Sequence, residues 1–217
     1  MPVPLSALVK AVLSRVRERE GYATKTKLVK YLYLLDLANY RKTGRTLTGF
    51  PWRFHLYGPW AEEFESLFRD LARDDQIQVT PSRRPDLDAE FVSTRERTDI
   101  ADLVDDATLG LEFRHIVDQW ADRRLGEMLD YVYFYTEPME TAQRGELLDF
   151  SLAQREERHL ELPGRQVVDP RAARRLKQEV ERRKAELRRK PDERFTPPNY
   201  DDVYFAARRL MEEDDGY

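Results

Sequence analysis

Cysteine is absent from this chain of 217 residues. Without a thiol the protein cannot build a disulfide framework, use a cysteine nucleophile, or hold zinc or an iron–sulfur cluster through cysteine ligands. A cysteine-free sequence fits a reducing compartment, so we expect the protein in the cytoplasm.

Glycine is scarce too, with nine residues in the whole chain. The sequence contains no P-loop, no G-x-G-x-x-G and no G-x-S-x-G motif, so nothing indicates a nucleotide cradle or a serine hydrolase. The histidines His55, His115 and His159 stand far apart and form no H-E-x-x-H pair. We therefore expect neither a metal nor a cofactor, and we expect no enzymatic activity.

Long apolar runs are missing as well. No segment approaches the roughly 20 consecutive apolar residues that cross a bilayer. The first residues, MPVPLSALVKAVLSRVRERE, lack a basic leader and are interrupted by Lys10 and then by alternating charges, which is unlike a secretory signal. We expect no membrane association.

Charge is plentiful but unevenly distributed. The chain is 36% charged and 41% hydrophobic, a composition that can bury a core beneath a heavily charged exterior. Its net charge is −4, yet residues 165–190 carry 11 Lys and Arg against 4 Asp and Glu, so the rest of the chain is acidic. This shift predicts a domain over residues 1–152 and a charged helical extension over 153–217, with a Pro-rich linker at 190–200.

Hydrophobic periodicity predicts a mainly α domain. Residues 5–20 read as an amphipathic helix that ends at Gly21, and residues 24–43 form a helix that is apolar almost all round, which predicts that it is buried. Two further helices are expected over 109–120 and 125–133, and a shorter one over 144–152. Asp169 and Pro170 are suited to begin a basic helix at 171–190, and a last helix follows the linker.

Between the second helix and residue 94 we expect a small amount of β-structure. The stretch FPWRFHLY, residues 50–57, alternates like an edge strand, and Gly58 with Pro59 predicts that a third helix begins at this corner and continues to about Arg73. Two short alternating runs, 76–80 and 90–94, flank a polar loop and predict a two-stranded ribbon.

This order of elements is also that of a winged helix, which gives a second interpretation: a DNA-binding transcriptional regulator. The third helix would then enter the major groove, and Arg83 and Arg84 of the ribbon loop would contact phosphate. The surface of that helix argues against DNA, since Glu62, Glu63 and Glu65 would be repelled by the phosphate backbone.

The C-terminal extension offers two separate features. Its basic helix, 171–190, is best interpreted as a solvated helix, because few aromatic residues lie between its charges as stacking platforms. The final helix has an apolar face that includes Tyr204, Phe205 and Leu210. Such a helix either folds back on its own domain or lies in a partner's groove. We favour folding back, and keep these residues as a candidate partner surface together with Glu62, Glu63 and Glu65.

A family resemblance rests on three places in the sequence. The stretch TKTKLVKYLYLLDLANYRKTGRTLTG followed by RFHLYGPW resembles the Panacea domain, the family of SocA-like antitoxins and phage-associated proteins. The matching positions are a K-L-x-K-L-L-Y helix, a turn and a Y-G-P corner, here Lys27, Leu28, Lys30, Leu32, Tyr33, Gly44, Arg45, Tyr57, Gly58 and Pro59. Glu137 and Pro138 stand where the family has its His/Glu/Pro-containing ending. Val29 and Tyr31 depart from the commoner Gln and Leu.

The resemblance implies a mainly helical, non-enzymatic protein. Its better-known members neutralise a genetically linked toxin, either by direct binding or by delivering it to a protease, so we expect a protein partner. Leu28, Leu32 and Tyr33 are most simply core residues. The polar motif residues are candidates for either intradomain pairs or partner contacts: Lys27, Lys30, Arg45 and Glu137.

Overall fold

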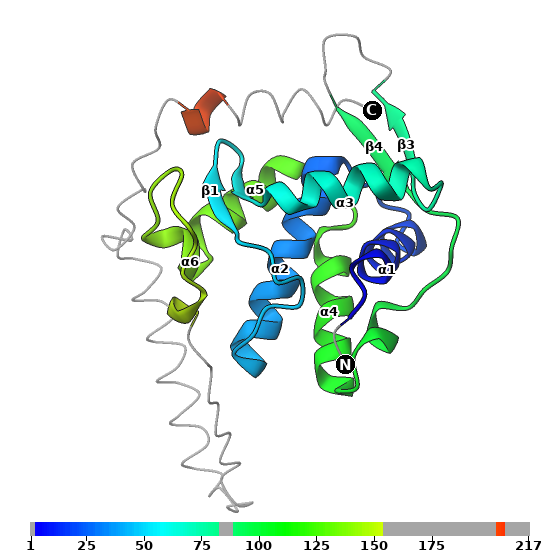
Figure 1. Ribbon diagram of the computed structural model, residues 1–217, viewed down its shortest axis with the longest axis horizontal. Helices are drawn as coiled ribbons and strands as arrows, with labels where there is room; N and C mark the ends of the chain where they lie inside the picture. Colours follow the sequence, from blue (N-terminus) through cyan, green and yellow to red (C-terminus); the bar gives the residue numbers. More distant parts are fainter. Residues whose placement is uncertain (1–2, 83–88, 154–202, 207–217) are drawn as a thin grey trace, which may run out of the picture. The chain divides into compact units, whose positions relative to one another are not determined.

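The computed structural model describes residues 3–82, 89–153 and 203–206 (Figure 1). The helices in chain order are α1 (Leu5–Glu18), α2 (Lys25–Thr43), α3 (Glu62–Arg73), η1 (Ile100–Leu103), α4 (Ala107–Trp120), α5 (Leu125–Phe134), α6 (Glu137–Glu140) and η2 (Phe150–Leu152). The strands form two antiparallel pairs, β1 (Arg53–His55) with β2 (Gly58–Trp60), and β3 (Gln78–Pro81) with β4 (Glu90–Ser93). The described part is mainly α with a small β-ribbon, as the sequence predicted.

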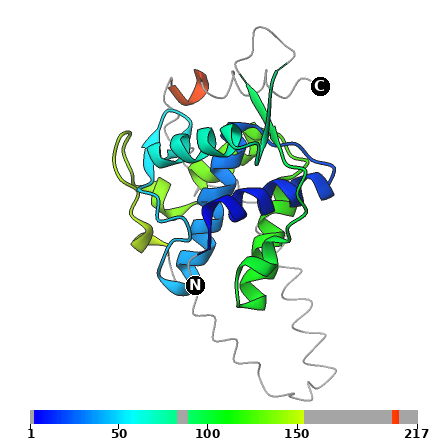
Figure 2. The same cartoon turned by 45° about the vertical axis from the view of Figure 1, so that its right-hand side comes forward.

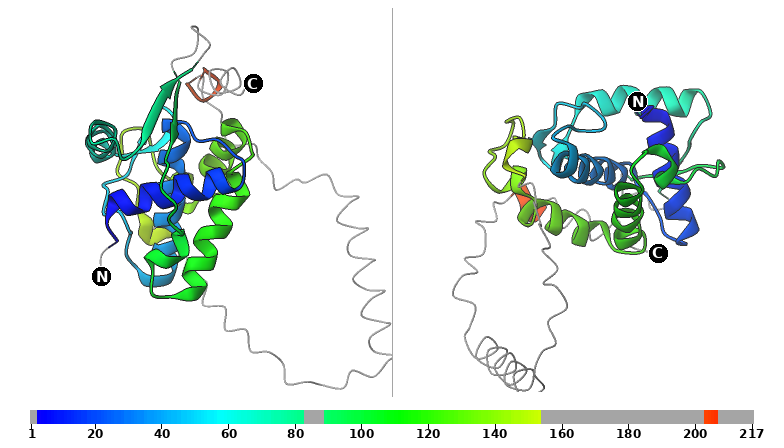
Figure 3. Two further views of the ribbon diagram at one scale, coloured as in Figure 1. Left: turned by 90° about the vertical axis from the view of Figure 1, so that its right-hand side faces the viewer. Right: turned by 90° about the horizontal axis from the view of Figure 1, so that it is seen from below.

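Helix α2 is the centre of the fold. Thr24 caps its first turn by accepting a hydrogen bond from the Lys27 amide, and Gly44 ends it in the left-handed conformation with φ 73°. Its residues from Lys27 to Asn39 are all buried, because α1, α4 and α5 each pack against it. The view from below shows these helices and α3 arranged around α2 (Figure 3). The prediction of a buried central helix is confirmed.

The predicted helices on either side are confirmed with small changes of boundary. Helix α1 buries its apolar stripe, including Leu8, Val12 and Val16, against α4 and η1. The bidentate pair of Arg15 with Asp118, at 2.7 Å for both bonds, joins α1 to α4. Helices α4 and α5 occupy the expected stretches and close the core around α2.

The corner at residues 53–60 is a β-hairpin and not the start of a helix, so that prediction is wrong. His55 pairs with Gly58, Phe54 with Pro59 and Arg53 with Trp60, and α3 begins only after Ala61. Gly58 has a φ of 85°, which only glycine adopts readily. Pro59 also fits a short strand, because its fixed φ is compatible with extended backbone and its missing N–H is tolerated at a sheet edge.

Residues 144–146 form a turn and a bend, and Leu147 bridges Arg53 of β1, so the helix predicted over 144–152 is wrong. The segment lies along β1, with the Phe54 amide donating to the Glu146 carbonyl at 3.0 Å and the Leu148 amide to the Trp52 carbonyl at 2.8 Å. Only Phe150–Leu152 form a short 3₁₀ turn. Gly145, with φ 87°, interrupts any helix here, and pairing with β1 satisfies the backbone instead.

The β3–β4 ribbon is confirmed and is joined to the turn before α2. Thr24 forms a bridge with Phe91, and the Val92 amide donates to the Ala23 carbonyl at 2.8 Å. The ribbon therefore lies beside α1 and the start of α2 (Figure 2). Apart from the β1–β2 hairpin between α2 and α3, the order of three helices followed by a ribbon is the one expected for a winged helix. Arg83 and Arg84 fall in the stretch 83–88 outside the described residues.

Candidate functional site

Lys27 and Lys30, the two motif lysines of α2, have no exposed surface. The Lys27 ammonium donates to the carbonyls of Ala121 at 3.2 Å and Arg123 at 2.8 Å, and it lies 3.9 Å from the centroid of the Tyr22 ring. These carbonyls follow the last turn of α4, where backbone acceptors lack intrahelical donors. Lys27 thus fixes the end of α4 to α2.

Lys30 makes the equivalent connection to the β1–β2 hairpin. Its ammonium donates to the Pro59 carbonyl at 2.9 Å. Burial lowers the pKa of this lysine from 10.5 to about 7, because an ammonium loses its hydration inside the protein. The lysine of the motif helix and the proline of the Y-G-P corner are therefore direct partners.

Tyr133 of α5 also contacts the hairpin. Its hydroxyl donates to the Leu56 carbonyl at 2.9 Å, and its ring stands edge-on to Phe54 with centroids 5.3 Å apart. A Cβ placed on Gly58 would lie 3.0 Å from Cε2 of this ring. Gly58 is consequently required for its conformation and for this close approach.

Residues 136–138, which form the last part of the motif, also contact α2. Glu137 pairs with Arg41 at 2.6 Å, and the Tyr33 hydroxyl lies 3.0 Å from the Thr136 hydroxyl. Pro138 is buried in α6. Leu28, Leu32 and Tyr33 are core residues, as expected, with at most 1% of their surface exposed.

Asp36 is a buried polar residue of α2 that sequence reasoning missed. Its carboxylate accepts from the amides of Leu47 at 2.6 Å and Thr48 at 2.8 Å, from the Thr48 hydroxyl, and from the Trp52 indole at 2.7 Å. Burial raises the pKa of Asp36, and these donors oppose the rise. A lone acidic residue inside the otherwise apolar run YLYLLDLA was the available signal.

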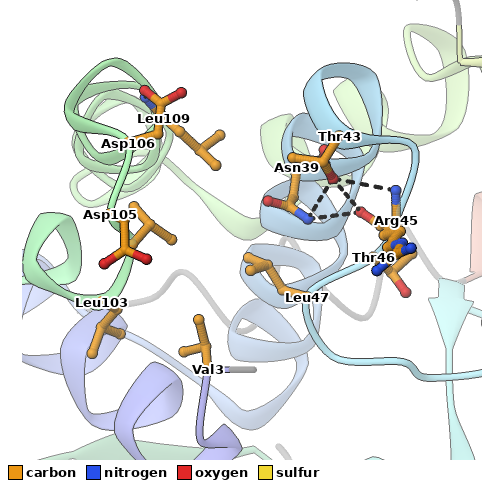
Figure 4. A pocket seen from close by; sticks show the side chains of 11 residues that line it. Val3, Asn39, Thr43, Arg45, Thr46, Leu47, Leu103, Asp105, Asp106 and Leu109 are labelled. Carbon is orange, nitrogen blue, oxygen red and sulfur yellow. Dashed lines mark hydrogen bonds between the residues drawn. The ribbon is translucent and has the colours of Figure 1, made fainter. Parts of the chain in front are cut away.

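A pocket of about 530 Å³ lies between the end of α2 and the start of α4 (Figure 4). One wall is the turn after α2, where the Asn39 amide donates to the Arg45 carbonyl at 2.7 Å. The opposite wall carries Asp105 and Asp106, and Lys42 reaches across to Asp106 at 2.8 Å. Arg45 is therefore a polar motif residue that lines a surface pocket.

Only part of the acidic face of α3 is exposed on the surface of the domain. Glu62 and Glu63 are exposed at the first turn. Glu65 instead pairs with Lys25 at 2.9 Å, and Lys25 also approaches Glu90 of β4 at 3.6 Å. Glu65 therefore helps to hold α3 and the ribbon against α2.

Of the C-terminal candidates, Tyr204 is buried, with 6% of its surface exposed, so it is not open to a partner in this arrangement. Its hydroxyl donates to Asp130 of α5, and its ring meets those of Tyr133 and Phe134. Phe205 is 46% exposed. For residues 203–206 the expectation of folding back is confirmed, whereas Leu210 and the basic helix 171–190 lie outside the described residues.

Within the described stretches, no three His, Asp or Glu side chains are placed to share a metal ion. No helix there is long and apolar enough to span a membrane. Among the polar motif residues, Lys27, Lys30 and Glu137 join α2 to its neighbours, and Arg45 lines a pocket.

Comparison with known proteins agrees with this geometry. Residues 28–133 match the family model described as antitoxin SocA-like, Panacea domain. This stretch is similar to the Panacea domain of SocA-like antitoxins. It runs from α2 to the end of α5 and includes the hairpin that Lys30 and Tyr133 hold.

The Panacea match leaves α1, α6 and the C-terminal extension outside its limits. Lys27, Glu137 and Pro138 also fall just beyond them, although the structure joins all three to the same core. Neither the curated proteins nor the solved structures contain a match to this chain.

Proposed function

We propose that the protein is a non-enzymatic, antitoxin-like factor that binds a protein partner and neutralises it or delivers it to a protease. The observation that carries this proposal is the SocA-like Panacea domain over residues 28–133. A genetically linked toxin, in a toxin–antitoxin or phage-defence setting, is the partner that the family favours.

The internal contacts of three polar motif residues support a binding role for other residues of the surface. Lys27, Lys30 and Glu137 are engaged in bonds between α2 and its neighbours, so they build the scaffold. Residues that choose a partner must then lie elsewhere on the surface. Shared scaffolds commonly carry different specificities in this way.

The first turn of α3 is the surface we propose for the partner. Glu62 and Glu63 are adjacent, exposed and acidic, and they lie on a helix whose other face is fixed in the core by Phe64, Phe68 and Leu71. A rigid acidic surface suits a basic partner, because complementary charge raises the association rate and excludes partners of like charge.

The test begins with tagged full-length protein purified from its native host. We expect one stoichiometric protein partner, encoded nearby, that stops growth when expressed alone and is tolerated when the chain is co-expressed. Glu62→Lys with Glu63→Lys should weaken binding at least about tenfold and abolish rescue, since two favourable charges become repulsive.

The matched control reverses two exposed carboxylates on other helices, Glu112→Lys with Glu127→Lys. It changes the net charge equally and should leave rescue intact. Equal loss in both double variants would refute α3 as the surface. A partner that is harmless when expressed alone would refute the antitoxin role itself.

A DNA-binding regulator is the second candidate, favoured by the bridge that joins the ribbon to the turn before α2. Its test is retardation of DNA by the purified chain at several salt concentrations. Under this alternative, Arg83→Ala with Arg84→Ala would weaken binding and reduce its salt dependence. Retardation that is unchanged by this double substitution would remove the ribbon loop as the DNA contact.

A further inference from the structure

Helix α5 carries an aromatic site filled by a residue from far along the chain. The rings of Tyr133 and Phe134 each stand 5.4 Å from the ring of Tyr204, both at 63°. The Asp130 carboxylate, one turn earlier on α5, accepts the Tyr204 hydroxyl. Two edge-on rings and a carboxylate therefore surround a single tyrosine side chain.

This combination selects tyrosine over other apolar residues. Edge-to-face contacts favour an aromatic ring, and an ionised carboxylate accepts a strong hydrogen bond from a phenol. A leucine in place of Tyr204 would make neither interaction, and a phenylalanine there would make the ring contacts but no hydrogen bond to Asp130. Residues 203–206 present Tyr204 from one helical turn, so the site accommodates a helical backbone.

The apolar surface extends beyond what residues 203–206 cover. Leu56, at the hairpin tip, remains 46% exposed, although its carbonyl is bonded to the same Tyr133. Val203 and Phe205 are 37% and 46% exposed on the docked turn itself. A longer helix with the same tyrosine anchor could bury more of this surface than the chain's own segment does.

We propose that Asp130, Tyr133 and Phe134 form a docking site for a tyrosine-bearing helical segment of a partner protein, and that residues 203–206 are its tethered competitor. The site lies on a different helix from the acidic turn of α3, and it does not depend on the partner's being a toxin. The chain's own segment is covalently joined to the site, so its binding is intramolecular and acts through an effective concentration. To bind, a partner segment must have enough affinity for the site to displace residues 203–206.

The experiment uses a fluorescein-labelled peptide of residues 199–213, followed by anisotropy against full-length protein. We expect the peptide to bind the Tyr204→Ala variant, whose site is open, and to bind the wild-type chain at least about tenfold more weakly because the site is filled. A peptide carrying Tyr204→Phe should bind the open variant several-fold more weakly, since it lacks the hydroxyl that Asp130 accepts.

Two double variants, each with one further substitution added to Tyr204→Ala, test where on the protein the peptide binds. Phe134→Ala removes one wall and should abolish peptide binding, whereas Tyr135→Ala, at a neighbouring position that is 57% exposed, should preserve it. Circular dichroism of each variant checks that the helices remain. Failure of the peptide to bind the Tyr204→Ala chain, or equal binding with and without Phe134, would overturn the proposal, and neither result bears on toxin neutralisation.

Discussion

The polar motif residues show what can and cannot be inferred at the scale of a single side chain. The sequence identifies Lys27, Lys30 and Glu137 as important, but it does not give their partners. The acceptors of Lys27 are the carbonyls of Ala121 and Arg123, more than 90 positions away. Carbonyl acceptors are present at every residue, so no sequence pattern marks them.

Lys30 should make stability depend on pH above neutrality. Its pKa is about 7 in the folded chain and 10.5 ordinarily, so between these values the unfolded chain holds one more proton. Stability therefore rises with pH in this window, by roughly 1 kcal/mol per pH unit from this group. Urea unfolding at pH 7.5 and 9 should show a smaller rise for Lys30→Met than for wild type. Equal slopes would mean that Lys30 titrates normally.

Two tyrosines of α2 provide a matched pair of predictions about buried hydroxyls. Among the described residues the Tyr31 hydroxyl is buried without a hydrogen-bond partner, whereas that of Tyr33 meets Thr136. Tyr31→Phe should raise the free energy of unfolding by about 1 kcal/mol, and Tyr33→Phe should lower it by about the same amount. Denaturant titration of both variants checks this, and a loss of stability in Tyr31→Phe would reveal an unrecognised partner.

At the scale of elements, the long periodic helices and the β3–β4 ribbon were predictable, whereas strand β2 and the segment 144–148 were not. The helices α1, α2, α4 and α5 follow from apolar residues at helical spacing, which is a local property. The segment 144–148 depends on a contact with a distant strand, because its Leu147 bridges Arg53 of β1. Local patterns there were compatible with a helix, and tertiary contacts decided otherwise.

The hairpin gives a prediction with an internal control. Gly58 and Gly49 both have a positive φ, 85° and 68°, but only at Gly58 would a Cβ meet another side chain. Gly49→Ala should cost about 1 kcal/mol for the left-handed backbone alone. Gly58→Ala should cost roughly 1–3 kcal/mol more, because Tyr133 must move and its bond to Leu56 weakens. Thermal and urea unfolding measure the difference, and equal costs would show that the hairpin adapts freely.

For the whole molecule, the sequence predicted the fold class and the family better than the site. The buried helix and the Y-G-P corner were enough to indicate a Panacea domain, because both are continuous in the chain. The pocket beside Arg45 and the Tyr204 site on α5 each combine segments distant in sequence. Asp130 and Phe134 had no distinguishing pattern, so the surface they form became visible only in three dimensions.

The C-terminal extension can be tested for its effect on the stability of the domain. A chain truncated after residue 164 should keep its helical circular dichroism and unfold cooperatively. Its stability should fall by about 1 kcal/mol, since burial of Tyr204 is lost while the entropy of closing a long loop is regained. Full-length Tyr204→Ala should lose the same amount, and Val203→Ala, at a position 37% exposed, should lose little. A larger loss on truncation would show that the extension stabilises the domain through further contacts.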